Sequence, residues 1–335
     1  MSTPDNSGPN AIPNAVGHKN PITAVITALS DMVSEKGQLP PMGADERLDG
    51  KTALVTGANA GLGKAIAIQL AQRGAHVLMA CRGGHPEAGE DVKAASGSDR
   101  VEMLKVDLSD LDSANALCDQ LKARGLPLDI TIFNAGLMPL SARRGPQGFE
   151  LMFTVHFLTN RLIVGRLLAD GLITPEADPS ERPRIVFVSS ESHRSADAID
   201  FDNFGAFKDY GLKDGVGEYG RTKLHLCTYA TELARQLGDD ISVHSLCPGP
   251  VASNIAREAP GWSKPLLGPI MKLMFRSPEK AAAPVLLLAG GKAMQGRTGV
   301  YLHMLREKAV SPLAGDAENG RRLWKESAQL LEGLN

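Results

Sequence analysis

Tyr219 and Lys223 are the two side chains of this sequence whose types and spacing best suit acid/base chemistry. They belong to the stretch EYGRTK at residues 218–223, which opens a helical pattern that continues to Leu237. Residues four apart share one face of a helix, so we expect the hydroxyl and the ammonium to face one pocket. A cation beside a phenol stabilises the phenolate, and Lys223 is therefore predicted to lower the pKa of Tyr219. A solvated helix face would show the same spacing. The other motifs of the chain must therefore decide between an acid/base pair and an ordinary helix surface.

A glycine-rich turn follows the first predicted strand. Residues 52–56 (TALVT) are a short apolar run, and GANAGLG at 57–63 leads from them into a helical pattern. Glycines allow a tight turn and a close approach to a pyrophosphate, whose charge the helix N-terminus attracts. The spacing G-x-x-x-G-x-G departs from G-x-G-x-x-G, and a plain turn is the alternative. The order of strand, turn and helix favours nucleotide binding.

Arg82 lies just beyond the second predicted strand, at residues 75–80. In a dinucleotide fold, an acidic residue there accepts a hydrogen bond from the ribose 2′-hydroxyl of NAD, whereas an arginine suits the 2′-phosphate of NADP. No acidic residue occupies this turn. We therefore predict NADP(H) in preference to NAD(H), and a surface arginine without a ligand is the alternative.

Strands and helices alternate along the rest of the chain. Regular alternation of this kind predicts a parallel sheet with crossover helices on both faces, and such sheets bind ligands at the carboxyl ends of their strands. We therefore predict an α/β fold, a Rossmann-type doubly wound parallel sheet, as one domain over residues 48–335. The further predicted strands are 101–106, 128–133, 184–188 and 241–246, and the predicted helices include 109–123, 148–171 and 217–237.

The first part of the chain differs in composition from this domain. Residues 1–20 are rich in Pro, Asn, Ser and Gly and are predicted to form a disordered tail. Residues 21–47 are predicted to be an amphipathic helical extension, whose helix begins at Pro21 and ends at Gly37. Its apolar run is far shorter than the roughly 20 residues that span a bilayer. We expect it to dock on the domain or on a partner subunit, with contact to a membrane surface as the alternative.

Composition excludes several classes of partner. A net charge of −2 gives no reason to bind nucleic acid, and no basic run is interleaved with aromatic residues. The four cysteines form no C-x-x-C pair and the eight histidines no H-x-x-x-H pair. We therefore predict no metal site, a reducing compartment and a cytoplasmic location.

Six short motifs in a fixed order resemble those of the short-chain dehydrogenases/reductases, over roughly residues 48–330. Further stretches resemble the retinol-dehydrogenase-like branch and the protochlorophyllide reductases: ACR at 80–82, GFE at 148–150, SSESH at 189–193 and RLW at 322–324. The six motifs are TGANAGLG at 56–63, DL at 107–108, NAG at 134–136, VSS at 188–190, YGRTK at 219–223 and PG at 248–249.

The resemblance implies a role for each matching residue. Tyr219 would be the acid/base, Lys223 would lower its pKa and bind the nicotinamide ribose, and Ser190, rather than its neighbour Ser189, would polarise the substrate carbonyl. Many relatives pair helices such as 148–171 and 217–237, so the resemblance also implies a homo-oligomer. The residues implied to contact the cofactor are Gly57, Asn59, Ala60, Gly61, Leu62, Gly63, Arg82, Asp107, Leu108, Asn134, Ala135, Gly136, Tyr219, Lys223, Pro248, Gly249, Val251 and Ser253.

His156 departs from the family pattern. The helix after GFE usually carries an asparagine that helps to hold a water next to the lysine, and alignment from GFE places His156 there, with Asn160 one turn later. A histidine both donates and accepts, so we count His156 among the catalytic candidates as a proton relay. A histidine satisfied by the core is an equally good interpretation.

The substrate end is predicted from an apolar stretch at residues 259–275, within a lid at about 255–277. Methionine and large apolar side chains suit a bulky hydrophobic substrate, although a core-packed helix or a membrane-facing patch would have the same composition. The sequence thus predicts an NADP(H)-dependent oxidoreductase that interconverts an alcohol and an aldehyde or ketone on a retinoid, steroid, aromatic ketone or similar molecule. A C=C double-bond reductase and a non-catalytic NADP-sensing protein are the alternatives.

Overall fold

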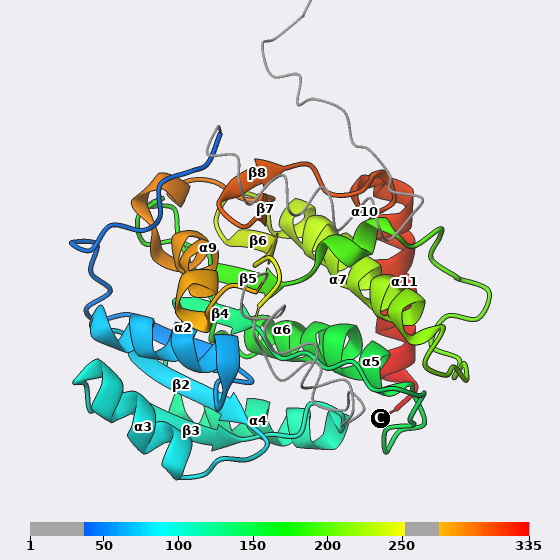
Figure 1. The fold of residues 1–335 in the computed structure, drawn as a ribbon, viewed down its shortest axis with the longest axis horizontal. Coiled ribbons are helices and arrows are strands. Elements are labelled where there is room, and N and C mark those ends of the chain that lie inside the picture. The colour runs from blue at the N-terminus through cyan, green and yellow to red at the C-terminus, as the bar shows by residue number, and fades with distance from the viewer. Residues whose placement is uncertain (1–36, 252–274, 335) are drawn as a thin grey trace, which may run out of the picture.

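One large sheet organises the chain. The fold is taken from a computed structural model, which describes residues 37–251 and 275–334 (Figure 1). The described residues form an eight-stranded sheet in the order β3-β2-β1-β4-β5-β6-β7-β8, in which only the β7–β8 pair is antiparallel. The strands are β1 (Thr52–Thr56), β2 (His76–Cys81), β3 (Val101–Lys105), β4 (Ile130–Phe133), β5 (Arg184–Val188), β6 (Ser242–Cys247), β7 (Tyr301–His303) and β8 (Arg306–Lys308).

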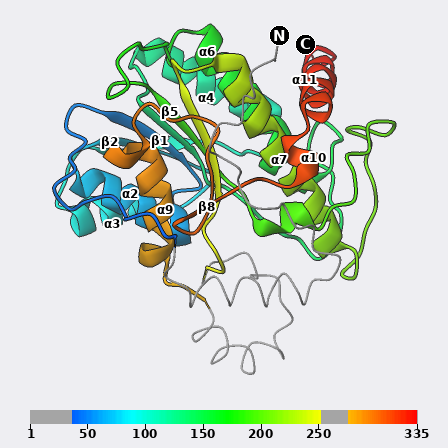
Figure 2. The same cartoon turned by 90° about the horizontal axis from the view of Figure 1, so that it is seen from above.

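Helices cover both faces of this sheet, as Figure 2 shows. Central strands such as β1 and β5 are buried along their whole length, which explains their continuous apolar character. One face carries α2 (Gly61–Gln72), α3 (Glu87–Ser96) and α9 (Pro278–Gly290). The other carries α4 (Leu111–Arg124), α5 (Leu151–Phe153), α6 (Thr159–Ala169), α7 (Gly215–Leu237), α10 (Pro312–Gly315) and α11 (Ala317–Glu332).

The predicted doubly wound α/β fold is confirmed. Each strand predicted from the sequence is present, with its ends shifted by at most two residues. The elements that were not predicted include α3, α10 and the short strands β7 and β8 at one edge of the sheet. The parallel strands present their carboxyl ends at one edge, where the predicted polar and glycine clusters lie together.

A single long helix carries the GFE motif at its start. Helix α5 continues through a π-helical segment, Thr154–Leu158, into α6. Among the described residues, Leu151–Ala169 is the helix long and apolar enough to cross a membrane, with a mean hydropathy of 1.2, yet 67% of it is buried in the domain. It packs against α4 and α7, so its apolar character is explained by the core.

The described part of the N-terminal extension lies along the domain. Residues 37–47 contain no helix: the Leu39 amide donates to the Leu305 carbonyl over 2.7 Å, next to β8, and Met42 is buried against the α2 and α9 side of the sheet. The predicted tail and the predicted helix fall in residues 1–36, outside the described residues. All four cysteines are buried free thiols.

Helix α11 packs across α6 and α7. Its Trp324 ring stacks on Tyr229 of α7, with centroids 5.9 Å apart, and the Arg161 guanidinium of α6 lies 4.1 Å from the centre of the Trp324 ring. Part of the surface of both helices is therefore covered by the chain's own last helix. Pairing of two copies through α6 and α7 stays a prediction, and it would have to use the area that α11 leaves free.

Replacing Trp324 by alanine should destabilise the domain by about 2 kcal/mol, because the substitution removes a large, partly buried ring and its contacts with Tyr229 and Arg161. Urea unfolding followed by circular dichroism measures this loss. Lys325→Ala, on the exposed side of the same helix, is the matched control and should change stability by less than about 0.5 kcal/mol. Equal stability of the two variants would show that α11 contributes little to the fold.

Candidate active site

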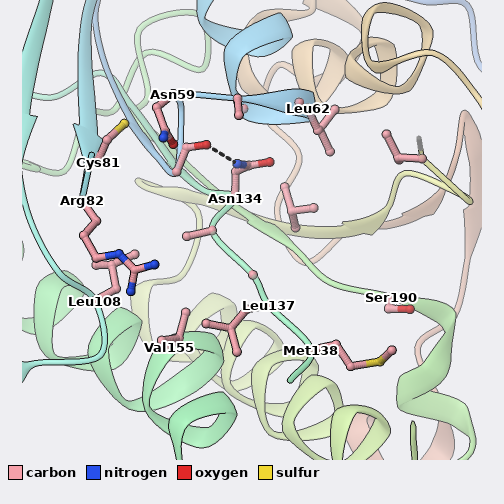
Figure 3. A pocket seen from close by; sticks show the side chains of 18 of the residues that line it. Asn59, Leu62, Cys81, Arg82, Leu108, Asn134, Leu137, Met138, Val155 and Ser190 are labelled. Atoms are coloured by element: carbon pink, nitrogen blue, oxygen red, sulfur yellow. Dashed lines mark hydrogen bonds between the residues drawn. The ribbon is translucent and has the colours of Figure 1, made fainter. Parts of the chain in front are cut away.

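A cleft of about 840 Å³ runs along the carboxyl edge of the sheet. Figure 3 shows its two ends: Asn59, Arg82 and Leu108 lie at one end, and Met138 and Ser190 at the other. The cleft is lined by the turns that follow β1, β2, β3, β4, β5 and β6, together with one face of α7. This is the position at which doubly wound sheets bind dinucleotides.

Glycines shape the wall beneath the centre of the cleft. A Cβ atom on Gly63 would lie 2.3 Å from the Gly57 carbonyl oxygen and 2.5 Å from Nδ2 of Asn134, so no larger residue fits there. Gly57 has a φ of +65°, which side chains rarely adopt. The Asn134 side chain donates to the Thr56 carbonyl over 3.0 Å and so ties the turn after β4 to the turn after β1. The result is a bare backbone surface that fits a pyrophosphate.

An exposed arginine lies at the end of the cleft that the turns after β2 and β3 form. Arg82 is exposed, and its guanidinium lies 3.8 Å from a carboxylate oxygen of Asp107, which is a long and weak contact. The Asp107 carboxylate accepts shorter hydrogen bonds from the amide and hydroxyl of Ser109, at 3.0 and 2.7 Å. Gly83 and Gly84 follow Arg82 and line the same wall without side chains. This end of the cleft thus combines a positive charge with room for an anionic group.

Ser190, Tyr219 and Lys223 converge at the other end. Tyr219 and Lys223 share one face of α7 and both line the cleft, as their spacing predicts. The Lys223 ammonium donates to the Val188 carbonyl over 3.0 Å and lies 5.6 Å from the centre of the Tyr219 ring. Ser190 lines the cleft and its hydroxyl lies 3.1 Å from that of Ser192, whereas the Ser189 hydroxyl lies 3.1 Å from the Cys227 thiol. The geometry supports Ser190 as the residue that faces a substrate.

The predicted effect of Lys223 on Tyr219 is not found. Burial, with a further contribution from Cys247, raises the pKa of Tyr219, and the hydrogen bond from Ser190 only partly opposes this. Burial also lowers the pKa of Lys223 to about 8, so only part of the lysine is protonated near pH 8. The sequence argument counted the attraction between cation and phenolate and omitted the cost of desolvating both groups.

The turn that carries Ser190 is anchored from behind. The Ser190 carbonyl accepts from Nδ1 of His193 over 2.7 Å, and Nε2 of His193 accepts from the Ser311 amide over 3.0 Å. Glu191 accepts from the Tyr301 hydroxyl over 2.7 Å and pairs with Arg194 over 3.1 Å. Burial would raise the pKa of Glu191, but Arg194, His303 and Tyr301 hold it at about 2. The SSESH motif therefore connects the Ser190 end of the cleft to β7 and the C-terminal segment.

His156 lies at the centre of the π-helical segment and is fully buried. Its Nε2 accepts from the Leu137 amide over 3.1 Å, and its Nδ1 lies 2.9 Å from the Thr222 hydroxyl. Burial, followed by the charge of Lys223, lowers the pKa of His156 well below its ordinary value. Both ring nitrogens are thus engaged by the protein.

Most of the predicted site residues line this one cleft. Ser253 and most of the predicted lid lie outside the described residues. The described residues on either side of this gap, Val251 and Phe275, line the cleft. Cleft residues that the sequence motifs did not single out include Gly83, Gly84, Leu137, Met138, Pro139 and Arg143, together with Leu151 of α5 and Val155 of the π-helical segment. In the described part of the chain, no three His, Cys, Asp or Glu side chains gather where they could hold a metal ion.

Comparison with known proteins agrees with this geometry. Residues 51–199 match the family described as short chain dehydrogenase. Retinol dehydrogenase 13 of Mus musculus is 34% identical over 292 residues, which cover 85% of this chain and 84% of the relative. The chain belongs to the short-chain dehydrogenase family. Within this family it is similar to the retinol dehydrogenases, and it is an oxidoreductase of the kind that interconverts alcohols and carbonyls.

Two further relatives bear on the site of this short-chain dehydrogenase. Polyprenol dehydrogenase of Mus musculus is 33% identical over 296 residues, covering 84% of each chain. The solved active-site complex of Pseudomonas aeruginosa RhlG with NADP is 25% identical, with a TM-score of 0.58, and covers 77% of this chain and 96% of its own.

The lowered pKa of Lys223 in this dehydrogenase predicts a pH dependence of stability without added cofactor. Between pH 8 and 10 the unfolded chain keeps a proton on this lysine that the folded protein has lost. Unfolding therefore takes up a proton, and stability rises with pH. The native protein should gain about 2 kcal/mol over this range relative to Lys223→Met. Urea unfolding at several pH values measures the difference, and parallel curves for the two proteins would contradict it.

Proposed function

We propose that the protein is an NADP(H)-dependent reductase or dehydrogenase acting on the carbonyl or alcohol of a bulky hydrophobic molecule. The single observation that carries the proposal is the continuity of the cleft. It joins an arginine with no acidic residue directly after β2, a bare glycine wall and the Ser190, Tyr219 and Lys223 cluster in one space. A dinucleotide extended from Arg82 would bring its nicotinamide to the tyrosine.

NADP(H) is the proposed cofactor because the adenosine end offers a guanidinium and no carboxylate directly after β2. A guanidinium binds phosphate through paired hydrogen bonds, whereas a 2′-hydroxyl is best bound by a carboxylate. The glycine turn at 57–63 would hold the pyrophosphate, and Asn134 to Gly136 would contact the ribose next to the nicotinamide. The NADP complex of RhlG gives this assignment further support.

The cluster at the other end suits proton transfer to a carbonyl oxygen. The bound nicotinamide supplies the hydride in reduction and accepts it in oxidation. Ser190 would donate a hydrogen bond to the carbonyl oxygen, and Tyr219 would give that oxygen its proton as the carbon becomes tetrahedral. Lys223, whose pKa is about 8, would stabilise the resulting phenolate as long as the lysine itself is protonated. The reverse sequence would oxidise an alcohol.

A hydrophobic substrate is proposed from the walls beside this cluster. Leu137, Met138 and Pro139 line the cleft from the loop after β4, and Val251 and Phe275 also line it. Apolar walls around a few polar groups are typical of pockets for small apolar ligands. Retinol dehydrogenase and polyprenol dehydrogenase, by their names, act on long apolar alcohols, which supports the same class of substrate here.

Tyr219→Phe should abolish most of the NADPH-dependent turnover of hydrophobic aldehydes and ketones while NADPH binding is kept. Loss of the proton donor predicts a fall in kcat of at least roughly 100-fold. Tyr229→Phe is the matched control, because Tyr229 lies on the same helix but packs against Trp324. Turnover is followed by NADPH oxidation, and product analysis with an enone tests for C=C reduction instead. Binding of NADPH without turnover of any hydrophobic carbonyl by the native protein would favour a cofactor-sensing role.

Arg82→Ala should weaken NADPH binding by about tenfold to a hundredfold, because one charge-assisted contact to phosphate is lost. NADH binding should change by less than roughly threefold, since NADH lacks the 2′-phosphate. Arg100→Ala serves as the control, because it removes an exposed arginine directly before β3, at the amino ends of the parallel strands and away from the cleft. Fluorescence titration measures both affinities. Equal losses for the two cofactors would remove the basis for the NADP(H) preference.

A further inference from the structure

The imidazole of His156 lies between two elements that the active site needs. On one side is the loop after β4, whose Leu137 amide donates to Nε2 over 3.1 Å. On the other side is α7, whose Thr222 hydroxyl lies 2.9 Å from Nδ1. His156 itself comes from the long helix α5–α6 and has no exposed surface. One side chain thus joins three separate segments of the chain.

The hydrogen bonds around this ring have a defined direction. An amide N–H can only donate, so Nε2 of His156 must be the unprotonated acceptor. In the neutral ring the proton is therefore on Nδ1, which donates to Thr222 Oγ1. The Thr222 hydroxyl in turn donates to the Tyr219 carbonyl over 3.0 Å. The chain of donors runs from Leu137 through His156 and Thr222 to the backbone of the catalytic tyrosine.

The same ring also contacts the functional groups directly. It meets the Tyr219 ring edge to face, with centroids 5.5 Å apart and planes at 89°. A Cβ atom built on Gly136 would lie 3.5 Å from Nε2 of His156 and 3.8 Å from Nζ of Lys223. The proposed ribose loop and the face of α7 that carries both catalytic side chains are therefore held at a fixed distance by one planar ring.

A proton relay through His156 would need a ring nitrogen that can change partners. Nε2 has a backbone partner that cannot accept a proton, and leaving that amide unpaired in the interior would be costly. The His156 carbonyl accepts from Nδ2 of Asn160 over 2.8 Å, one turn along the helix. Among the described groups facing the ring, Lys223 and Tyr219 are titratable, and the positive charge of Lys223 opposes protonation.

We propose that His156 is a positioning residue, a neutral imidazole that fastens the loop at residues 134–137 to helix α7 and so sets the distance between bound cofactor and Tyr219. It would replace, by direct contacts, the water-holding role that the resemblance to the family implies for an asparagine at this position. The effect on catalysis rests on the proposed function, whereas the protonation state of the ring does not. The two parts are tested separately.

Nitrogen NMR of protein labelled at its histidines tests the ring itself, and needs no substrate. The His156 signals are identified by their loss in His156→Gln. We expect a protonated Nδ1 and an unprotonated Nε2 that stay unchanged from about pH 8 to about pH 5, whereas a free histidine titrates near 6.5. A ring that gains a proton in this range, or that carries its proton on Nε2, would overturn the proposal whatever the enzyme's activity.

A pair of Thr222 variants tests the positioning role. Thr222→Val keeps the shape of the side chain but removes the hydroxyl that His156 and the Tyr219 carbonyl share, and Thr222→Ser keeps the hydroxyl. For Thr222→Val we expect kcat to fall about tenfold at unchanged NADPH affinity, with Thr222→Ser within about twofold of the native protein. Combining Thr222→Val with His156→Phe should be no worse than His156→Phe alone, since both remove one connection.

The pH profile separates positioning from relay. His156→Gln, which keeps one donor and one acceptor, should recover most of the activity lost in His156→Phe and leave the midpoint of the kcat profile unchanged. A shifted midpoint in His156→Gln, with Thr222→Val equal to Thr222→Ser, would favour the relay and overturn the positioning role. If the native protein turned over no carbonyl, the proposed function would fail, while the NMR result would still decide the state of His156.

Discussion

The cost of burying Lys223 is the constraint on which the catalytic end of this structure depends. The side chain is 3% exposed, and the hydrogen bond that the structure gives its ammonium is to the Val188 carbonyl. Within the described residues no carboxylate forms an ion pair with it, so its desolvation is only partly compensated. The pKa falls to about 8, which leaves a group that gains and loses its proton near neutrality. The proposed stabilisation of the Tyr219 phenolate by Lys223 is therefore strongest below about pH 8, where the ammonium is charged.

The two ends of the cleft are built on different principles. The cofactor end is mostly backbone: glycines without room for a Cβ, an asparagine that ties two turns together, and one arginine. The substrate end consists of side chains from segments far apart in the sequence, such as Met138 and Phe275. A backbone surface demands glycine at fixed spacing, whereas an apolar wall accepts many residues. The cofactor class can therefore be derived from this chain with more detail than its substrate.

The same difference explains what the sequence could and could not predict. The strands β1 and β5 were placed correctly because buried parallel strands are continuous apolar runs. Strand β8, with the sequence REK, carries no such signal, and β7 is only three residues long. The candidate cluster of Ser190, Tyr219 and Lys223 could be predicted from spacing within one helix and from strand ends. The anchoring of Ser190 through His193 to Ser311 could not, because it joins residues 118 positions apart.

The direction of the Tyr219 pKa could not be read from spacing either, because burial depends on the whole fold. The π-helical segment shows a similar limit. One extra residue in the turn at Thr154–Leu158 changes the direction of every side chain around it, and a helical repeat of 3.6 residues contains no trace of it. In this fold the His156 ring contacts Leu137 and Thr222, and the Asn160 side chain donates to the His156 carbonyl. The histidine at this position thus lies in a local backbone irregularity and is followed one turn later by an asparagine that binds its carbonyl. We interpret these three features together as what positions α7 against the loop at residues 134–137.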